Sequence, residues 1–175
     1  ALNHLWETGF TRAELMALGL RLGADVPFFL YGQNAFAEGV GEELMPLETP
    51  DCWYVVIEPG VAAPTAAIFA SPELTRNTKP VRITDFSKAS IGFGKNDLQV
   101  VATRMFPQIA EALEMLGQYG EARMTGSGAC VFCGFTHEHE ADRAIREIRE
   151  SEPAHWNAWK ARAIQQHPLS HLLKS

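Results

Sequence analysis

A single carboxylate, Asp25, lies within residues 22–29 (LGADVPFF), between a glycine and an apolar stretch. An ionised carboxylate in such surroundings is costly to desolvate, which favours a functional reason for its presence. A carboxylate is ionised at neutral pH and can accept the proton of an attacking hydroxyl group. Asp25 is therefore the candidate catalytic base. The residue alone leaves open the alternative that Asp25 only caps or pairs locally.

A second set of residues that could take part in chemistry is the loop within residues 124–132 (MTGSGACVF), where Gly126 and Gly128 flank Ser127. Glycine adopts backbone conformations closed to other residues, so such a loop can turn several N–H groups toward an anion. No helix clearly follows to add its dipole, and a tight β-hairpin turn is the alternative interpretation. The pattern indicates a phosphate-binding loop or a simple turn.

The cysteine and histidine residues predict no metal site. Cys52, Cys130 and Cys133 form an odd set with no second pair to complete a zinc site. Cys130 and Cys133 lie three apart in a strand-like run and should face opposite sides of a sheet, which favours buried reduced thiols. His137 and His139 begin a charged helical run, which indicates a solvated helix start.

The elements around Asp25 follow from local signals. Thr11 and Glu14 form a capping box at the start of an amphipathic helix, and Gly23 offers a left-handed stop at its end. Pro27 removes a backbone donor and favours an extended residue before it. We therefore expect Asp25 just beyond a helix C-terminus, on a stiffened turn where the helix does not resume.

From about Met45 the pattern changes to alternating strands and helices. The predicted strands are residues 53–57, 122–125, 129–135 and 159–164. Two helices are predicted with caps: residues 66–70, capped by Thr65, and a helix that is capped by Asn96 and Asp97 and runs to Phe106. Two further helices are predicted, one that begins at Pro107 and one at residues 138–150. Residues 72–95 are predicted to be irregular. This order predicts an α+β fold with helices on one face of a mainly antiparallel sheet, ferredoxin-like in its alternation.

Length and composition limit the classes of protein. With 175 residues and 46% hydrophobic content, the chain can bury a core of one domain or a little more. No apolar run approaches the roughly 20 residues that cross a bilayer, and no secretion signal is apparent, so we expect a cytoplasmic protein with no membrane partner. The net charge of -6 argues against nucleic acid as a partner.

The first residues suggest that the chain is a fragment. Residues 1–6 read as the middle of a helix, with neither an initiator methionine nor a cap. The stretch up to Phe36 also lacks enough predicted strands to close a domain. We expect the missing part to precede residue 1.

Four stretches together resemble the kinase superfamily of galactokinase, homoserine kinase, mevalonate kinase and phosphomevalonate kinase, abbreviated GHMP. They are residues 22–29 (LGADVPFF), 36–42 (FAEGVGE), 72–78 (PELTRNT) and 125–129 (TGSGA). Within the superfamily, the chain is similar to the kinases that phosphorylate the methylerythritol hydroxyl of a diphosphocytidyl substrate in the non-mevalonate isoprenoid pathway. The resemblance implies a ferredoxin-like GHMP kinase C-terminal domain at residues 46–175, preceded at residues 1–45 by the tail end of the N-terminal kinase domain.

The resemblance also implies roles for individual residues. Asp25 accepts the hydroxyl proton as that oxygen attacks the γ-phosphoryl group of ATP, which is the co-substrate and arrives with Mg²⁺. Phe69 stacks on the cytosine, in a pocket lined by Pro64 and Thr65, and such a stack is worth about 1–3 kcal/mol. The residues near the ATP phosphates are Gly126, Ser127, Gly128 and Ala129. Without the resemblance, core packing on a short helix explains Phe69 equally well.

One departure limits the expected activity of the chain alone. The superfamily's glycine-serine-rich ATP loop and its N-terminal catalytic lysine are not found in these 175 residues. The resemblance implies that a missing N-terminal segment carries both, so the isolated chain should bind ATP poorly and show no kinase activity. The partner is then a small-molecule alcohol linked to cytidine diphosphate. Another GHMP kinase with a different alcohol substrate, or a non-catalytic α+β ligand-binding module, remains the alternative.

Overall fold

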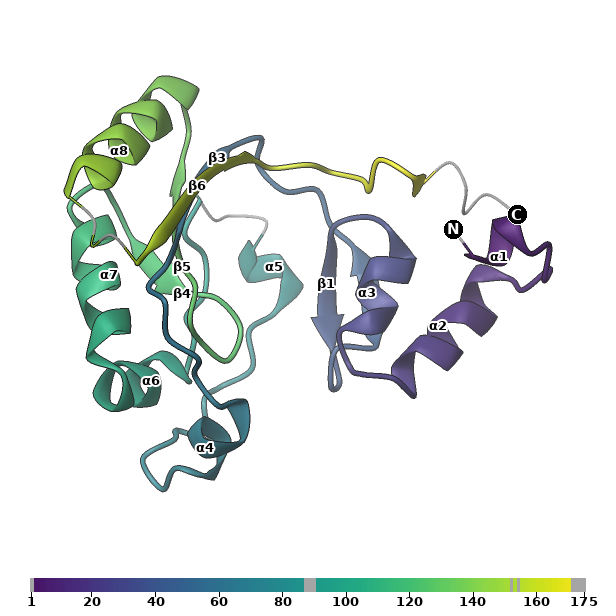
Figure 1. The fold of residues 1–175 in the computed structure, drawn as a ribbon. Coiled ribbons are helices and arrows are strands. Elements are labelled where there is room, and N and C mark those ends of the chain that lie inside the picture. Colours follow the sequence, from purple (N-terminus) through teal and green to yellow (C-terminus); the bar gives the residue numbers. More distant parts are fainter. Residues whose placement is uncertain (1, 87–90, 152, 154, 171–175) are drawn as a thin grey trace. The chain divides into compact units, whose positions relative to one another are not determined.

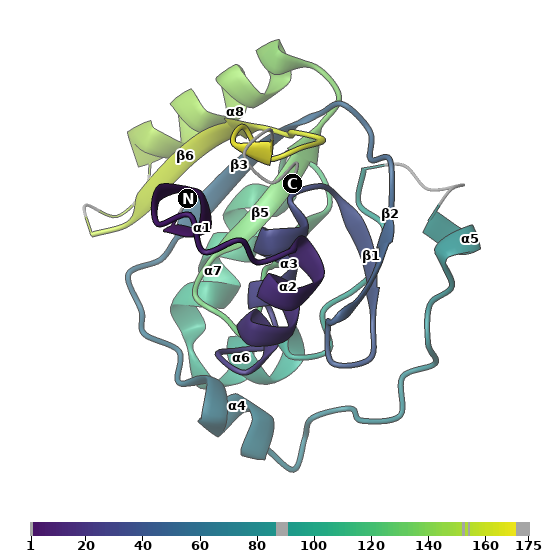
Figure 2. The ribbon, with the colours of Figure 1, turned by 90° about the vertical axis from the view of Figure 1, so that its right-hand side faces the viewer.

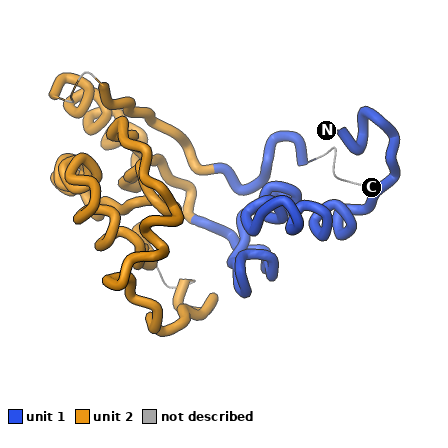
Figure 3. The backbone as a smooth tube through the Cα atoms, turned by 60° about the horizontal axis from the view of Figure 1, so that its bottom comes forward, with its two compact units in different colours: residues 1–49, 164–175 blue, residues 50–163 orange. Residues whose placement is uncertain are grey.

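The computed structural model describes residues 2–86, 91–151, 153 and 155–170 (Figure 1). The chain divides into two compact units (Figure 3). The first unit comprises residues 1–49 and 164–175, and the second comprises residues 50–163. In the described part of the chain, every helix is too short or too polar to span a bilayer.

The described residues of the first unit form three helices and a β-hairpin. They are α1 (Leu2–Leu5), α2 (Arg12–Leu20), α3 (Val26–Tyr31), β1 (Ala35–Glu38) and β2 (Glu43–Pro46). The predicted capping box is confirmed, since Thr11 accepts the N–H of Glu14 at 3.3 Å and the Glu14 carboxylate accepts the N–H of Thr11 at 2.8 Å. Burial of Gly19 lets α2 and α3 approach closely, because a Cβ at this position would lie 2.8 Å from a methyl carbon of Leu30.

Asp25 lies in a turn beyond the C-terminus of α2, as predicted, but the predicted stop at Gly23 and the predicted absence of a helix after Asp25 were wrong. Gly23 has no positive φ, and α2 ends instead at Leu20 with Arg21 in a right-handed conformation. Pro27 does not block a helix but lies buried in the first turn of α3. Its fixed φ suits that turn, where the absent N–H has no helical partner to lose. The chain therefore starts a new helix directly after Asp25.

The hairpin of the first unit was not predicted. β1 and β2 pair in antiparallel register, from Ala35 opposite Pro46 to Glu38 opposite Glu43. Gly39 and Gly41, at φ 70° and 117°, provide the reversal between the strands. The strands are only four residues long and have no fully buried side chain, so their sequence carries little periodic signal.

The second unit is a four-stranded antiparallel sheet in the order β4-β5-β3-β6. Its strands are β3 (Trp53–Glu58), β4 (Ala122–Met124), β5 (Val131–Phe135) and β6 (Asn157–Arg162), and its helices are α4 (Thr65–Ala70), α5 (Ile83–Phe86), α6 (Gln99–Met105), α7 (Pro107–Gly117) and α8 (Glu138–Ser151). With α7 and α8 as the crossovers, the sheet unit runs β-α-β-β-α-β along the chain. The α+β class is confirmed.

The core of the second unit lies between the sheet and the helices α7 and α8, which cover one face (Figures 1 and 2). Alternate residues of β5 are buried, as a sheet with one covered face requires. The fully buried side chains include Val55, Ile57, Ile68, Ile109, Leu116, Val131 and Ile148. Residues 87–90 of the predicted irregular region lie outside the described residues, and α5 is a short helical turn before them.

Candidate active site

Asp25 immediately precedes α3, and its side chain forms no capping hydrogen bond. The side chain is exposed, and within the described residues it has neither a hydrogen-bond partner nor an ion-pair partner. The alternative of a local cap or pair is therefore wrong for this chain. Exposure also means that the carboxylate is not desolvated in this chain, contrary to the expectation from its apolar neighbours. An exposed carboxylate without a partner is free to accept a proton from a bound hydroxyl group.

The glycine loop is the hairpin turn between β4 and β5, closed by the N–H of Thr125 donating to the carbonyl of Cys130 at 3.0 Å. Three of its residues have positive φ: Gly126 at 60°, Gly128 at 130° and Ala129 at 82°. A positive φ at alanine costs on the order of 1–3 kcal/mol, and such strain tends to concentrate at ligand-binding sites. The loop is thus a hairpin turn, as the alternative interpretation had it, but one with a strained backbone.

Thr65, predicted to line the cytosine pocket, and Ser127, predicted to lie near the ATP phosphates, are in contact within the second unit. The hydroxyl groups of Thr65 and Ser127 lie 2.6 Å apart, at hydrogen-bond distance. The predicted role of Thr65 as a helix cap is wrong, because Pro64 occupies the cap position of α4 and no side chain caps it. The hydroxyl of Thr65 therefore connects the start of α4 to the glycine loop.

Phe69 lies on α4 with its ring half exposed, at 50% of its full accessible surface. The neighbouring Ile68 is the side chain that α4 buries in the core. Core packing therefore does not explain Phe69, and its ring is available to a ligand. Pro64 and Thr65 at the start of the same helix are also exposed.

The segment after α4 supports that helix. Arg76 donates from Nη2 to the carbonyl of Phe69 at 2.6 Å, and Glu73 forms an ion pair with Arg104 of α6 at 2.6 Å. Both residues belong to the stretch PELTRNT. Their roles could not be predicted from the sequence, because their partners become neighbours only in the folded chain.

Asn96 is a further residue at the loop whose contacts were not predicted. Its amide nitrogen donates to the carbonyls of Met124 at 3.0 Å and Gly126 at 2.7 Å. The sequence predicted only that Asn96 and Asp97 cap a helix. In the structure α6 begins at Gln99, its N-cap residue is Leu98, and no side chain forms a capping hydrogen bond there. The preference of asparagine for caps and turns was the available signal, and it indicates nothing about a loop 30 residues away.

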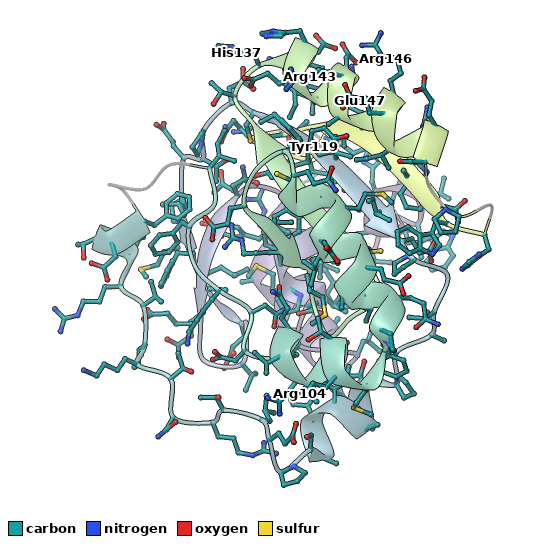
Figure 4. The ribbon with its side chains drawn as sticks, turned by 90° about the vertical axis from the view of Figure 1, so that its left-hand side faces the viewer. Arg104, Tyr119, His137, Arg143, Arg146 and Glu147 are labelled. Atoms are coloured by element: carbon teal, nitrogen blue, oxygen red, sulfur yellow. The ribbon has the colours of Figure 1, made fainter. Side chains whose placement is uncertain are left out.

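The remaining candidate groups are the three cysteines and the two histidines that begin α8. Cys52, Cys130 and Cys133 are free thiols, and burial raises the pKa of both Cys130 and Cys133, which makes their reactive thiolate forms scarcer. His137 and His139 are exposed at the start of α8, as predicted, and Figure 4 shows His137 there. The described residues contain no group of three His, Cys, Asp or Glu side chains that could hold a metal ion.

Three comparisons relate the chain to known proteins. Residues 82–154 match the family described as GHMP kinases C terminal. The chain is 67% identical over its whole length to the 4-diphosphocytidyl-2-C-methyl-D-erythritol kinase of Janthinobacterium sp. (strain Marseille), and 64% identical over 98% of its length to the kinase of the same name from Herminiimonas arsenicoxydans. It spans about 59% of the length of both relatives.

A solved structure gives the same relationship at the level of the fold. The crystal structure of a 4-(cytidine 5'-diphospho)-2C-methyl-D-erythritol kinase matches 92% of this chain with a TM-score of 0.72 and 32% sequence identity, and the match covers 60% of that kinase. The matched family region includes β4, β5, the glycine loop between them and all of α8. Residues 82–154 of the chain therefore form a GHMP kinase C-terminal domain.

Proposed function

We propose that this chain forms part of an ATP-dependent kinase that phosphorylates the hydroxyl group of 4-diphosphocytidyl-2-C-methyl-D-erythritol in the non-mevalonate isoprenoid pathway. The observation that carries the proposal is the 2.6 Å contact between Thr65 and Ser127. It joins the helix that bears the exposed ring of Phe69 to the strained glycine loop. A nucleobase platform and an anion-binding loop in contact suit an enzyme that brings a cytidine-bearing alcohol to a nucleotide phosphate.

Asp25 is the general base in this proposal. Its carboxylate accepts the proton of the methylerythritol hydroxyl as that oxygen bonds to the γ-phosphorus of ATP. The bond from the γ-phosphorus to the bridging oxygen breaks, and ADP leaves with that electron pair. General-base assistance typically contributes about 10²- to 10⁴-fold to the rate, and positioning and electrostatics supply most of the rest.

The glycine loop and Phe69 provide binding. N–H groups in the loop donate to phosphate oxygens, and the ring of Phe69 stacks on cytosine, with Pro64 and Thr65 beside it. Magnesium arrives with ATP and neutralises phosphate charge. The described side chains offer no cluster of ligands for the ion, so we assign none of them to it. A cytoplasmic location and the absence of a nucleic-acid partner belong to the same proposal.

The test is a chimera in which this chain replaces the 59% of the Janthinobacterium kinase that it matches. We expect the chimera to phosphorylate the diphosphocytidyl substrate. Asp25→Asn should lower kcat by at least about 10²-fold with little change in the KM for ATP, because only proton transfer is lost. The control is Glu150→Gln, a change to another exposed carboxylate on α8, which should leave kcat unchanged.

Three results would contradict the proposal. Near-normal turnover by the Asp25→Asn chimera would remove the assigned role of Asp25 and favour a non-catalytic explanation for the residue. Equal or better turnover of homoserine or mevalonate would replace the diphosphocytidyl substrate with that of another GHMP kinase. An inactive chimera whose fold is intact would oppose the kinase assignment itself.

A further inference from the structure

The side chain of Asn96 uses all of its hydrogen-bonding groups to connect the start of α6 with the glycine loop. Its two amide hydrogens go to two carbonyls, those of Met124 at 3.0 Å and Gly126 at 2.7 Å. Its Oδ1 accepts the N–H of Leu98 at 3.0 Å. A short side chain with two donors beside an acceptor is an amide, so neither aspartate nor serine can reproduce this set of contacts.

These contacts fix the direction of one peptide group in the loop. In a trans peptide, the carbonyl of one residue and the N–H of the next point in opposite directions. Because the Gly126 carbonyl points to Asn96, the N–H of Ser127 points away from Asn96. The same relation holds two peptide groups earlier, where the Met124 carbonyl accepts from Asn96 and the N–H of Thr125 donates to the carbonyl of Cys130.

A second contact from α6 holds the strand that leads into the loop. Gln99 accepts the N–H of Met124 through Oε1 at 2.8 Å. Met124 is therefore held through its carbonyl by Asn96 and through its N–H by Gln99. Asn96 also holds the carbonyl of Gly126, so side chains at the start of α6 hold the chain up to that residue, and the positive φ angles of Gly128 and Ala129 follow it.

We propose that Asn96 is a positioning residue, which holds the Gly126 carbonyl so that the Ser127 N–H is presented to a nucleotide phosphate. The phosphate part rests on the function proposed above, whereas the holding of the loop does not. Asn96 touches neither the substrate nor the reacting atoms in this account. It acts through the loop, so its loss should disturb ATP use and leave binding of the alcohol substrate unchanged.

The first measurement is amide hydrogen exchange of the 175-residue chain with Asn96→Asp. Aspartate retains the acceptor for Leu98 but loses both donors, and it places a carboxylate against two carbonyls. We expect exchange of the Thr125 amide to accelerate about tenfold, as the loss of roughly 1–1.5 kcal/mol of hydrogen bonding predicts. The amide of Val55 in β3 should exchange at its original rate.

The control for this measurement is Tyr119→Phe. Tyr119 donates to Glu147 at 2.9 Å and lies before β4, at the opposite end of that strand from the loop (Figure 4). Its loss removes one side-chain hydrogen bond from the second unit without touching the loop. Unchanged exchange of Thr125 in Asn96→Asp, or equal acceleration at Thr125 and Val55, would overturn the inference that Asn96 holds the loop.

The second measurement is the kinetics of the chimera. Asn96→Asp should lower kcat/KM for ATP by about tenfold or more while the KM for the alcohol substrate stays within error, and Tyr119→Phe should change neither. Wild-type kinetics for ATP despite a loosened loop would overturn the phosphate part of the proposal. If the unsubstituted chimera is inactive, the proposed function fails, while the exchange experiment still decides whether Asn96 holds the loop.

Discussion

At the scale of single residues, the glycine loop makes two matched substitutions informative. Gly126 has φ 60° and open space around an added Cβ, whereas Gly128 has φ 130° and an added Cβ would lie 3.0 Å from the Cβ of Ala63. Gly126→Ala should lower the free energy of unfolding by about 1 kcal/mol, the ordinary cost of a left-handed alanine. Gly128→Ala should cost more, on the order of 2–3 kcal/mol, because strain and a steric clash combine. Urea unfolding of the 175-residue chain measures both values.

Equal costs for the two substitutions would contradict the geometry of the loop. A value for Gly128→Ala below that of Gly126→Ala would show that Ala63 moves aside freely. The substitutions are otherwise alike, since each adds one methyl group two residues apart in the same turn.

Residue-scale predictions succeeded where the interaction is local. The capping box joins Thr11 and Glu14, three residues apart, and the types of these residues suffice to predict it. Thr65 failed as a predicted cap because its hydroxyl meets Ser127, 62 residues further along the chain. Asn96 likewise serves a loop that no local pattern relates to it. Roles set by such distant partners depend on the packed fold.

At the scale of elements, Lys160 connects β6 to α8. It pairs with Asp142 and, at 3.0 Å, with Glu138, and it lies 4.8 Å from the ring centre of Trp53. The hydrogen bond to Asp142, followed by that to Glu138, raises the pKa of Lys160 above its ordinary value of 10.5. The charged form therefore stabilises the folded chain below that value, and the stabilisation is lost as pH rises through the raised pKa.

The variant Lys160→Met tests this connection through its pH dependence. Its thermal unfolding midpoint should lie below that of the wild type near pH 7, and the gap should close above pH 10.5. The control is Lys95→Met, which breaks a more exposed pair with Asp97 and should show a smaller gap at neutral pH. A gap for Lys160→Met that is independent of pH would mean that packing on Trp53, rather than charge, holds β6 to α8.

The elements of the second unit follow from hydrophobic periodicity, which is why they were predicted well. β3, α7 and α8 each bury one regular set of side chains, and such a pattern is visible in the sequence. The first unit gives little of this signal. Its hairpin has no buried side chain in either strand, and α3 begins with a proline motif that also fits a turn.

At the scale of the whole molecule, burial differs sharply between the two units. All the buried hydrophobic side chains of the described chain, except Pro27, lie between Cys52 and Ala158. In the first unit, Leu22 is 84% exposed and Phe29 is 68% exposed. Amide exchange of the 175-residue chain should therefore be at least about 100-fold faster in α2 than in β3, since little apolar burial opposes local opening there.

The comparison should use Leu18 in α2 and Val55 in β3, whose amides both lie inside regular elements. Similar protection at the two amides would show that the units unfold together. In that case the limited apolar burial in the first unit would not determine how easily its amide groups open to exchange. Exchange measured by NMR resolves both residues in one sample.

The position of β3 in the sheet also affects when this strand can fold during synthesis on the ribosome. β3 is the first strand of the second unit, yet both of its neighbours, β5 and β6, come late in the sequence. Glu58 and its partner Asn157 are 99 residues apart. A ribosome adding about 5–20 residues per second needs roughly 5–20 seconds to supply that length. During synthesis, the apolar strand Trp53–Glu58 waits for that time before both of its sheet partners are present, so it is a segment that chaperones would need to protect.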